Sequence, residues 1–284
     1  MKTSTEIASI AKFVGEERAV EYVAKAGFEA WDFSMFVMCK YDRQAKRLLD
    51  NDHPLAGKDY LKFARKLRQI GLDNGIECNQ SHAPFPTYIP EIRAHYERAI
   101  ECTAEAGGKI CIIHPDNFKS AEENAEIYHE LLPFAKSCGV KIATENMFNW
   151  DKERDCACFA ACATPQSFVD HLNAVNDPFL VACLDIGHAE ITSLNTSARD
   201  MIHALKGNLQ ALHIHDNNKL WDQHQIPFSG KIDFCEVVKA LKEIGYNGYL
   251  TLEADAHLRN HTAENVMDGI NELASAAMRL REMF

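Results

Sequence analysis

The chain has 284 residues, of which 46% are hydrophobic and 25% are charged. This composition supplies enough apolar material for a folded core, and the length suits about one or two domains. The 41 acidic and 30 basic residues give a formal net charge of −11. Such a charge argues against nucleic acid as a partner, because an acidic surface repels a phosphate backbone.

The sequence contains no segment typical of membranes or secretion. The opening residues, MKTSTEIASIAKF, lack a long apolar core, and no window approaches the roughly 18 apolar residues of a spanning helix. The ten cysteines are scattered, and Cys111 and Cys183 lie within apolar runs, which favours free thiols in a reducing compartment. We therefore expect a cytoplasmic protein without a membrane partner.

Short apolar runs alternate with longer segments of helical periodicity along the whole chain. Two weaker candidate strands lie near residues 4–10 and 29–34, and six clearer ones follow at 76–82, 109–114, 140–145, 179–185, 209–215 and 248–253. The helices between them have readable ends: Ser120 and Glu123 form a capping-box pattern, Thr164 precedes Pro165, and Gly107 ends a helix that begins near Pro90.

This alternation is typical of βα units around a parallel sheet, and no linker or break in composition divides the chain. The sequence therefore predicts a single α/β domain over residues 1–284, folded as a (βα)8 TIM barrel. A doubly wound open sheet is the main alternative, but no glycine-rich phosphate loop follows the first strand.

The six clearer strands all end on side chains that can bind a metal ion. These residues are His82, His114, Glu145, Asp185, His215 and Glu253. In a barrel the carboxyl ends of all strands face one rim, so we expect these side chains to converge, with His188 reaching the same place from a loop. Carboxylates and imidazoles without a thiolate suit Mn²⁺, Zn²⁺, Co²⁺ or Mg²⁺.

A set of short motifs, in this order and spacing, resembles the xylose-isomerase-like TIM barrel superfamily. The motifs are HAPF (82–85), IHP (113–115), TEN (144–146), LDIGH (184–188), HIHDN (213–217), DQH (222–224) and LE (252–253). The superfamily includes sugar and sugar-phosphate isomerases, epimerases and endonuclease IV. The resemblance implies one divalent ion held by Glu145, Asp185, His215 and Glu253, with His213 as the alternative to His215.

For the isomerase branch, the resemblance implies proton transfer next to a carbonyl through a metal-stabilised enediolate. Glu145 and Glu253 would transfer the proton, and His188 would contact a substrate oxygen. The expected partner is a small sugar or sugar phosphate, and the candidate substrate-binding residues are His82, His114, His188, Lys231, Trp31 and Asp32. The sequence leaves open whether the chain forms homo-oligomers.

The endonuclease branch implies another chemistry, hydrolysis of a phosphodiester at abasic DNA by up to three zinc ions. The residues that match its additional ligands are His82, His114, His188, Asp222 and His224. The net charge of −11 argues against this function, and so does the segment 226–233, where Lys231 departs from the expected Gly-Glu-Gly pattern. A non-catalytic metal-binding or sugar-binding barrel is a third alternative.

Overall fold

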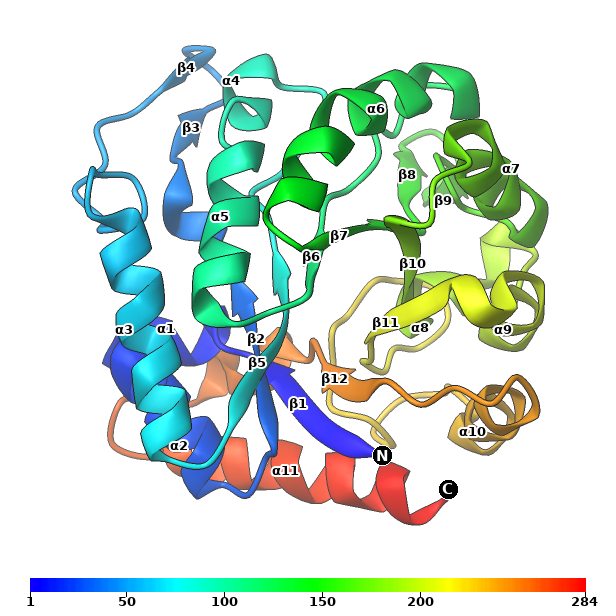
Figure 1. The fold of residues 1–284 in the computed structure, drawn as a ribbon. Coiled ribbons are helices and arrows are strands. Elements are labelled where there is room, and N and C mark those ends of the chain that lie inside the picture. Colours follow the sequence, from blue (N-terminus) through cyan, green and yellow to red (C-terminus); the bar gives the residue numbers. More distant parts are fainter.

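The computed structural model describes residues 1–284 and contains one sheet of eight parallel strands, in the order β11-β10-β7-β6-β5-β2-β1-β12. The strands are β1 (Lys2–Glu6), β2 (Ala30–Ser34), β5 (Glu77–His82), β6 (Ile110–Ile112), β7 (Lys141–Glu145), β10 (Leu180–Asp185), β11 (Leu209–His213) and β12 (Tyr249–Leu252) (Figure 1). The two outer strands meet, because Ile214 bridges to Leu252 and its carbonyl accepts from the Glu253 N–H at 3.0 Å. The sheet therefore closes into the predicted TIM barrel.

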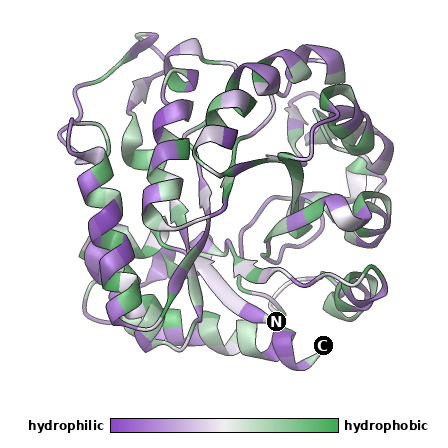
Figure 2. Cartoon of the chain, viewed as in Figure 1, coloured by the Kyte–Doolittle hydropathy of each residue, from purple (hydrophilic) through white to green (hydrophobic).

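Helices follow the strands and cover the outside of the barrel, with hydrophilic and hydrophobic residues alternating along them (Figure 2). They are α1 (Ala8–Val14), α2 (Glu16–Lys25), α3 (Tyr60–Asp73), α4 (Pro90–Arg93), α5 (Tyr96–Ala106), α6 (Ala121–Ser137), α7 (Pro165–Val175), α8 (Ile186–Ala189), α9 (Ala198–Leu205), α10 (Phe234–Glu243) and α11 (Val266–Glu282). The predicted capping box of Ser120 and Glu123 and the Thr164 cap are both confirmed. None of the helices is long and apolar enough to cross a membrane.

Some element bounds differ from those predicted. The first strand ends at Glu6 rather than near residue 10, because α1 begins at Ala8. The helix expected from Pro90 is two helices, α4 and α5, and the second ends at Gly107, whose φ of 92° suits glycine. Two hairpins, β3 (Tyr41–Asp42) with β4 (Arg47–Leu48) and β8 (Phe148–Asp151) with β9 (Cys156–Phe159), extend loops that follow barrel strands.

The barrel interior has an apolar side and a polar side. Ile112, Ala143, Val181, Cys183 and Ala211 form a small buried cluster on β6, β7, β10 and β11. On the opposite side, the buried residues of β1, β2 and β5 include many polar ones, and β1 is pale to purple in Figure 2, where β7 and β10 are largely green. The functional residues lie at the carboxyl ends of the strands, above both sides.

Candidate functional site

A cavity of about 480 Å³ lies at the carboxyl ends of the barrel strands. Seven of the predicted residues line it: His82, His114, Glu145, His188, Asp222, His224 and Glu253. Asp185, His213 and His215 are fully buried and contact these lining residues from behind. The predicted side chains therefore converge, as the parallel arrangement of strands requires.

Four of these residues form a first group that could hold a metal ion. The ligand atoms of Glu145, Asp185, His213 and Glu253 all lie within 4.8 Å of one another. His213 Nδ1 is 2.9 Å from Glu145 Oε1 and 3.3 Å from Glu253 Oε2. The sequence favours His215 for this group, but the structure places His213 there, because β11 ends at His213 and the chain then carries His215 away.

A second group contains His82, His114 and Glu145. The Nε2 atoms of the two imidazoles are 2.8 Å apart, and they lie 3.7 Å and 3.1 Å from Glu145 Oε2. Burial and the neighbouring His114 lower the pKa of His82 well below its ordinary value, so His82 is neutral and can act as a ligand. Glu145 belongs to this group and to the first, with a different oxygen in each.

A third group contains His188, His215, Asp222 and His224. Asp222 Oδ2 is 3.4 Å from His188 Nε2 and 3.1 Å from His224 Nε2, and His215 Nε2 is 3.0 Å from Asp185 Oδ1. Two buried atoms of this group, His215 Nε2 and Asp222 Oδ1, and Asp185 Oδ2 of the first group have no partner with hydrogen-bond geometry, although His215 Nε2 and Asp185 Oδ1 are close. Buried polar atoms normally find partners, so this donor set of imidazoles and carboxylates fits a metal ion.

The charges of the first group separate its two glutamates. Burial opposes the ionisation of Glu145, but the positive charge of His213 and the hydrogen bond with His114 hold the pKa of Glu145 well below its ordinary value. Burial raises the pKa of Glu253 to about 8, and His213 and His224 oppose this shift only in part. Without an ion, Glu145 is therefore a carboxylate at neutral pH, while Glu253 mostly carries a proton.

Asp222 raises the pKa of two imidazoles of the third group, those of His188 and His224, against the effect of burial. Burial lowers the pKa of His224, yet the hydrogen bond and the charge of Asp222 raise it to about 10. His188 shows the same balance, with Asp185 and Asp222 raising its pKa well above the ordinary value despite burial. The third group of the metal-free protein is therefore held together by protons that a divalent ion would replace.

Asn146, from the TEN motif, joins the ends of β7 and β10. Its side-chain amide exchanges two hydrogen bonds with the backbone of Asp185, at 2.8 Å and 2.9 Å, and its carbonyl contacts His188 Nδ1 at 2.9 Å. Asp185 in turn caps α8 by accepting from the His188 N–H at 2.7 Å. No role was predicted for Asn146 from the sequence. Its position directly after Glu145, at the end of a strand, could have marked it as part of the site.

Gly187 is required where α8 passes the ring of His215. A Cβ at Gly187 would overlap the imidazole of His215, so any larger residue forces the ring to move. The ring of His215 also stacks on His224, with centroids 4.0 Å apart. The glycine of LDIGH therefore allows the third group to form.

Three residues predicted to bind substrate lie outside the cavity. Trp31 and Asp32 are fully buried and do not line it. Asp32 points into the barrel two residues before β2 ends, and Trp31, on the other face of the strand, packs against α3 beside Gly71. Lys231 is exposed and does not line the cavity, and its segment is held by Asp216, whose carboxylate accepts from the N–H groups of Gly230 and Ile232. The structure therefore does not bring these three residues together with the others at the cavity wall.

The cavity has a second polar wall, from β1 with α1 and from the 3₁₀ segment Asp255–Asn260 (η4), that the sequence does not reveal. Glu6, Lys12 and Arg259 line it. Glu6 is buried, and both its carboxylate oxygens accept hydrogen bonds from Ser9. Glu6 ends β1, so correct bounds for that strand would have identified it by the same strand-end criterion as the others.

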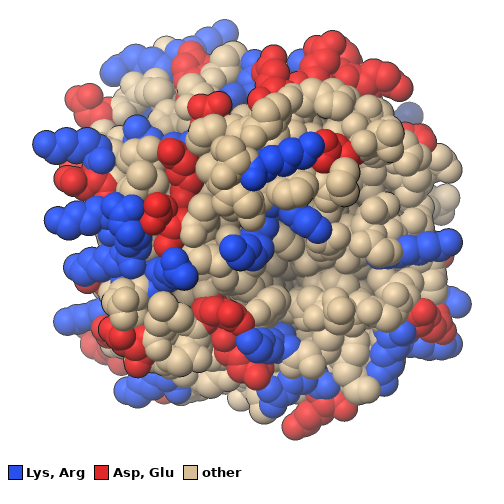
Figure 3. All heavy atoms as spheres, in the orientation of Figure 1, with Lys and Arg blue, Asp and Glu red and all other residues tan.

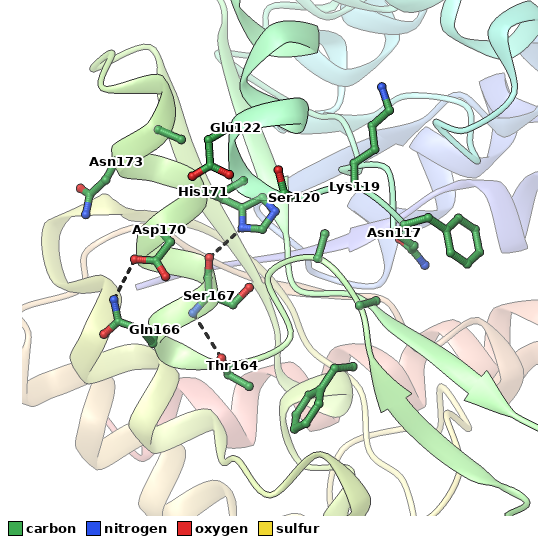
Figure 4. A pocket seen from close by; sticks show the side chains of 16 residues that line it. Asn117, Lys119, Ser120, Glu122, Thr164, Gln166, Ser167, Asp170, His171 and Asn173 are labelled. Atoms are coloured by element: carbon green, nitrogen blue, oxygen red, sulfur yellow. Dashed lines mark hydrogen bonds between the residues drawn. The ribbon is translucent and has the colours of Figure 1, made fainter.

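Another hollow lies outside the barrel, between the N-terminal end of α6 and the length of α7 (Figure 4). Ser120, Thr164, Ser167 and His171 contribute to its lining, and His171 Nδ1 contacts the Ser167 carbonyl at 2.7 Å. None of the metal-capable groups includes a residue of this hollow. The candidate site is therefore the cavity at the barrel rim.

Basic side chains are mixed with acidic ones on the face seen in Figure 3. On α3, the most basic helix, Arg65 is paired with Glu105 at 3.1 Å and Lys66 with Glu17 at 2.6 Å. Arg65 and Lys66 are therefore partly neutralised and do not extend a continuous basic surface.

The fold and the site define a TIM barrel whose strand ends carry clustered carboxylates and imidazoles. Residues 20–277 match the model of the xylose isomerase-like TIM barrel family, and the chain belongs to that family. An uncharacterized protein of Methanocaldococcus jannaschii is 25% identical, over 93% of this chain and 89% of its own.

Two solved structures share the fold along nearly the whole chain. One is D-psicose 3-epimerase from Clostridium cellulolyticum H10 with D-tagatose, with a TM-score of 0.71, 19% identity and coverage of 100% of this chain and 99% of that one. The other is the IOLI protein with a bound zinc atom, with a TM-score of 0.71, 18% identity and coverage of 98% and 99%. At these identities the likeness establishes the fold.

Proposed function

We propose that this protein is a metal-dependent isomerase or epimerase acting on a sugar or sugar phosphate. The observation that carries the proposal is the convergence on one atom, His213 Nδ1, of Glu145 at the end of β7 and Glu253 directly after β12. Two carboxyl groups so placed can act on one small substrate from two sides. The similar structure of D-psicose 3-epimerase supports this substrate class.

The residues that would hold the ion are Glu145, Asp185, His213 and Glu253. A divalent ion bound there supplies Lewis acidity that polarises a substrate carbonyl. Glu145, which the surrounding imidazoles keep ionised, accepts the proton from the carbon next to that carbonyl. Glu253, whose own proton the ion would displace, would return to the other face of that carbon a proton taken up from solvent, and His188, at the cavity wall, would donate a hydrogen bond to a substrate oxygen.

The second polar wall of the cavity, which includes Lys12 and Arg259, bears on whether the substrate is phosphorylated. Lys12 and Arg259 are the only lysine and arginine that line the cavity. Lys12 has no ion pair, and Arg259 uses one nitrogen for Asp255 at 3.2 Å, which leaves further N–H groups free. We propose that these two cations, rather than Lys231, bind the phosphate of a sugar phosphate.

A second candidate function is phosphodiester hydrolysis by several zinc ions. The second and third groups favour it, because an isomerase with one ion needs neither His82 and His114 nor Asp222 and His224 as ligands. The net charge of −11 and the paired basic residues of α3 argue against DNA as the substrate. The number of bound ions therefore bears directly on the choice.

The first experiment is elemental analysis of protein purified without chelators, followed by exchange of the substrate α-proton with deuterium, measured by NMR on ketoses and their phosphates. Glu145→Gln and Glu253→Gln should each slow exchange by about 10²- to 10⁴-fold. Glu190→Gln is the matched control, because Glu190 pairs with Lys219 outside the cavity. Full exchange in both test variants refutes the proton-transfer roles.

The alternatives give different results in the same experiments. About one ion per chain together with proton exchange supports the isomerase or epimerase. Two or three zinc ions, no exchange and hydrolysis of an abasic-site phosphodiester support the second candidate. Bound metal with neither reaction supports a non-catalytic binding barrel.

A further inference from the structure

A chain of buried polar side chains runs beneath the candidate metal centre, inside the barrel. Ser4 Oγ donates to Asn79 at 2.6 Å, and Asn79 donates in turn to Thr251 at 3.0 Å and to Gln80 at 3.1 Å. The interior of a TIM barrel is ordinarily filled by branched aliphatic residues. Its polar character here, on β1, β5 and β12, calls for a physical reason.

The network ends at Asp32, on β2. Asp32 is completely buried, and its Oδ2 accepts a hydrogen bond from Gln80 Nε2 at 2.9 Å. Gln80 is itself fixed, because the same nitrogen donates to the Leu212 carbonyl at 3.3 Å and its oxygen accepts from Asn79. A buried carboxylate is costly unless it is paired. His213 is the one side chain beside Asp32 that can carry a positive charge.

His213 lies between Asp32 and the two glutamates. Its Nε2 is 3.4 Å from Asp32 Oδ2, and its Nδ1 faces Glu145 at 2.9 Å and Glu253 at 3.3 Å. A neutral imidazole has one N–H and one lone pair. If Nε2–H donates to Asp32, the lone pair lies on Nδ1 and points to the place where an ion would bind.

We propose that Asp32 is a positioning residue that fixes the tautomer and the ring orientation of His213, so that Nδ1 is the metal ligand. The inference rests on the metal centre of the proposed function and adds the residue that orients one of its ligands. Gln80 and the polar network hold the carboxylate in register with the ring. The polar side of the barrel thus has a specific role, the orientation of a ligand.

The test compares four proteins: wild type, Asp32→Ala, Asp32→Asn and Ser4→Ala. Zinc affinity is measured by chelator competition, and the geometry of the site is followed by the visible spectrum of the Co²⁺-loaded protein. Loss of a partner that orients a metal-bound histidine lowers affinity by about 10- to 100-fold, with Asp32→Ala near the upper value and Asp32→Asn near the lower. The cobalt spectrum should change with both Asp32 variants. Ser4→Ala breaks the far end of the same network and should leave affinity and spectrum unchanged.

Failure of this inference is distinguishable from failure of the proposed function. His213→Ala serves as the reference for loss of the site. If the wild type binds no ion that His213→Ala removes, the metal centre itself is refuted. If the wild type does bind such an ion, Asp32→Asn decides the inference. This variant keeps the size of the side chain, so it remains informative if Asp32→Ala does not fold. Wild-type affinity and spectrum in Asp32→Asn would show that Asp32 has no positioning role.

Discussion

Metal binding to the group of Glu145, Asp185, His213 and Glu253 should depend steeply on pH. Burial raises the pKa of Glu253 to about 8, so at pH 7 the metal-free protein holds this proton about ten times out of eleven. Although burial lowers the pKa of His213, the carboxylate of Glu145 and the hydrogen bond with Asp32 help to raise it well above the ordinary value, so His213 is also protonated. An ion must displace both protons, because metal ligands bind as bases.

The expected magnitude is about two protons released per ion at pH 7, which changes apparent affinity by about 100-fold per pH unit below pH 8. Calorimetric titration of the metal-free protein with zinc, in buffers of different ionisation enthalpy, measures this number directly. Glu253→Gln removes one of the two protons, so its release should fall to about one. Release of less than about half a proton by the wild type would show that these groups are not ligands.

The same two groups fix the sign of a stability effect in the metal-free protein. Glu253 has a folded-state pKa above its ordinary value of 4.5, so its contribution to stability is present below pH 4.5 and is lost as pH rises towards 8. The raised pKa of His213 acts in the same direction at higher pH. The melting temperature of the metal-free protein should therefore fall over this range, and saturating zinc should reverse the trend.

Two further predictions concern the third group and the two cations, Lys12 and Arg259, of the second polar wall. Gly187→Ala should destabilise the protein by about 1–3 kcal/mol in thermal melting by displacing His215. If elemental analysis shows more than one ion in the wild type, this variant should also lose the ion of the third group, and unchanged metal content would then contradict the role of His215. Gly207→Ala, where a Cβ meets nothing within 4 Å, is the control and should change neither melting temperature nor metal content. Lys12→Met and Arg259→Gln should each raise KM for a ketose phosphate by about tenfold or more but leave KM for the free sugar unchanged, with Lys62→Met as the control. Equal effects on both substrates in steady-state kinetics would rule out a phosphate-binding role.

The alternation of strand and helix patterns was enough to predict the barrel, because each βα unit carries its own periodicity and its own caps. Strand bounds were less certain where a helix follows at once. The β1 strand shows the difficulty: Ile7 and Ile10 prolong an apolar pattern that is in fact the start of α1. That error of a few residues concealed Glu6, which faces the cavity.

The choice between His213 and His215 could not be made from sequence alone. Residues two apart on a strand face the same side, so alternation does not separate them. What separates them is where β11 ends and what surrounds the next residues: Gly187 leaves room for the ring of His215, and His224 stacks on it. Both features are tertiary contacts between segments far apart in the chain.

The placement of Asp32 shows a further limit of the strand-end criterion. Asp32 points into the barrel, as alternation along β2 predicts, but depth along the barrel axis is set by the stagger of the strands. Asp32 is paired in register with Glu6 and Gln80, and it lies one layer below Ser34, which is level with His82. Asp32 therefore contacts the candidate ligand His213, at 3.4 Å, while it does not line the cavity.

The three metal-capable groups are physically coupled, and this bears on function. Glu145 contributes one oxygen to the first group and the other to the second, while Asp185 belongs to the first group and contacts His215 of the third. An ion in one group would neutralise the carboxylate that it shares with the next and lower the attraction for a second ion. The number of ions is therefore decided by the balance of charge within the cluster, and ligand identity alone, which is all that the sequence provides, does not determine it.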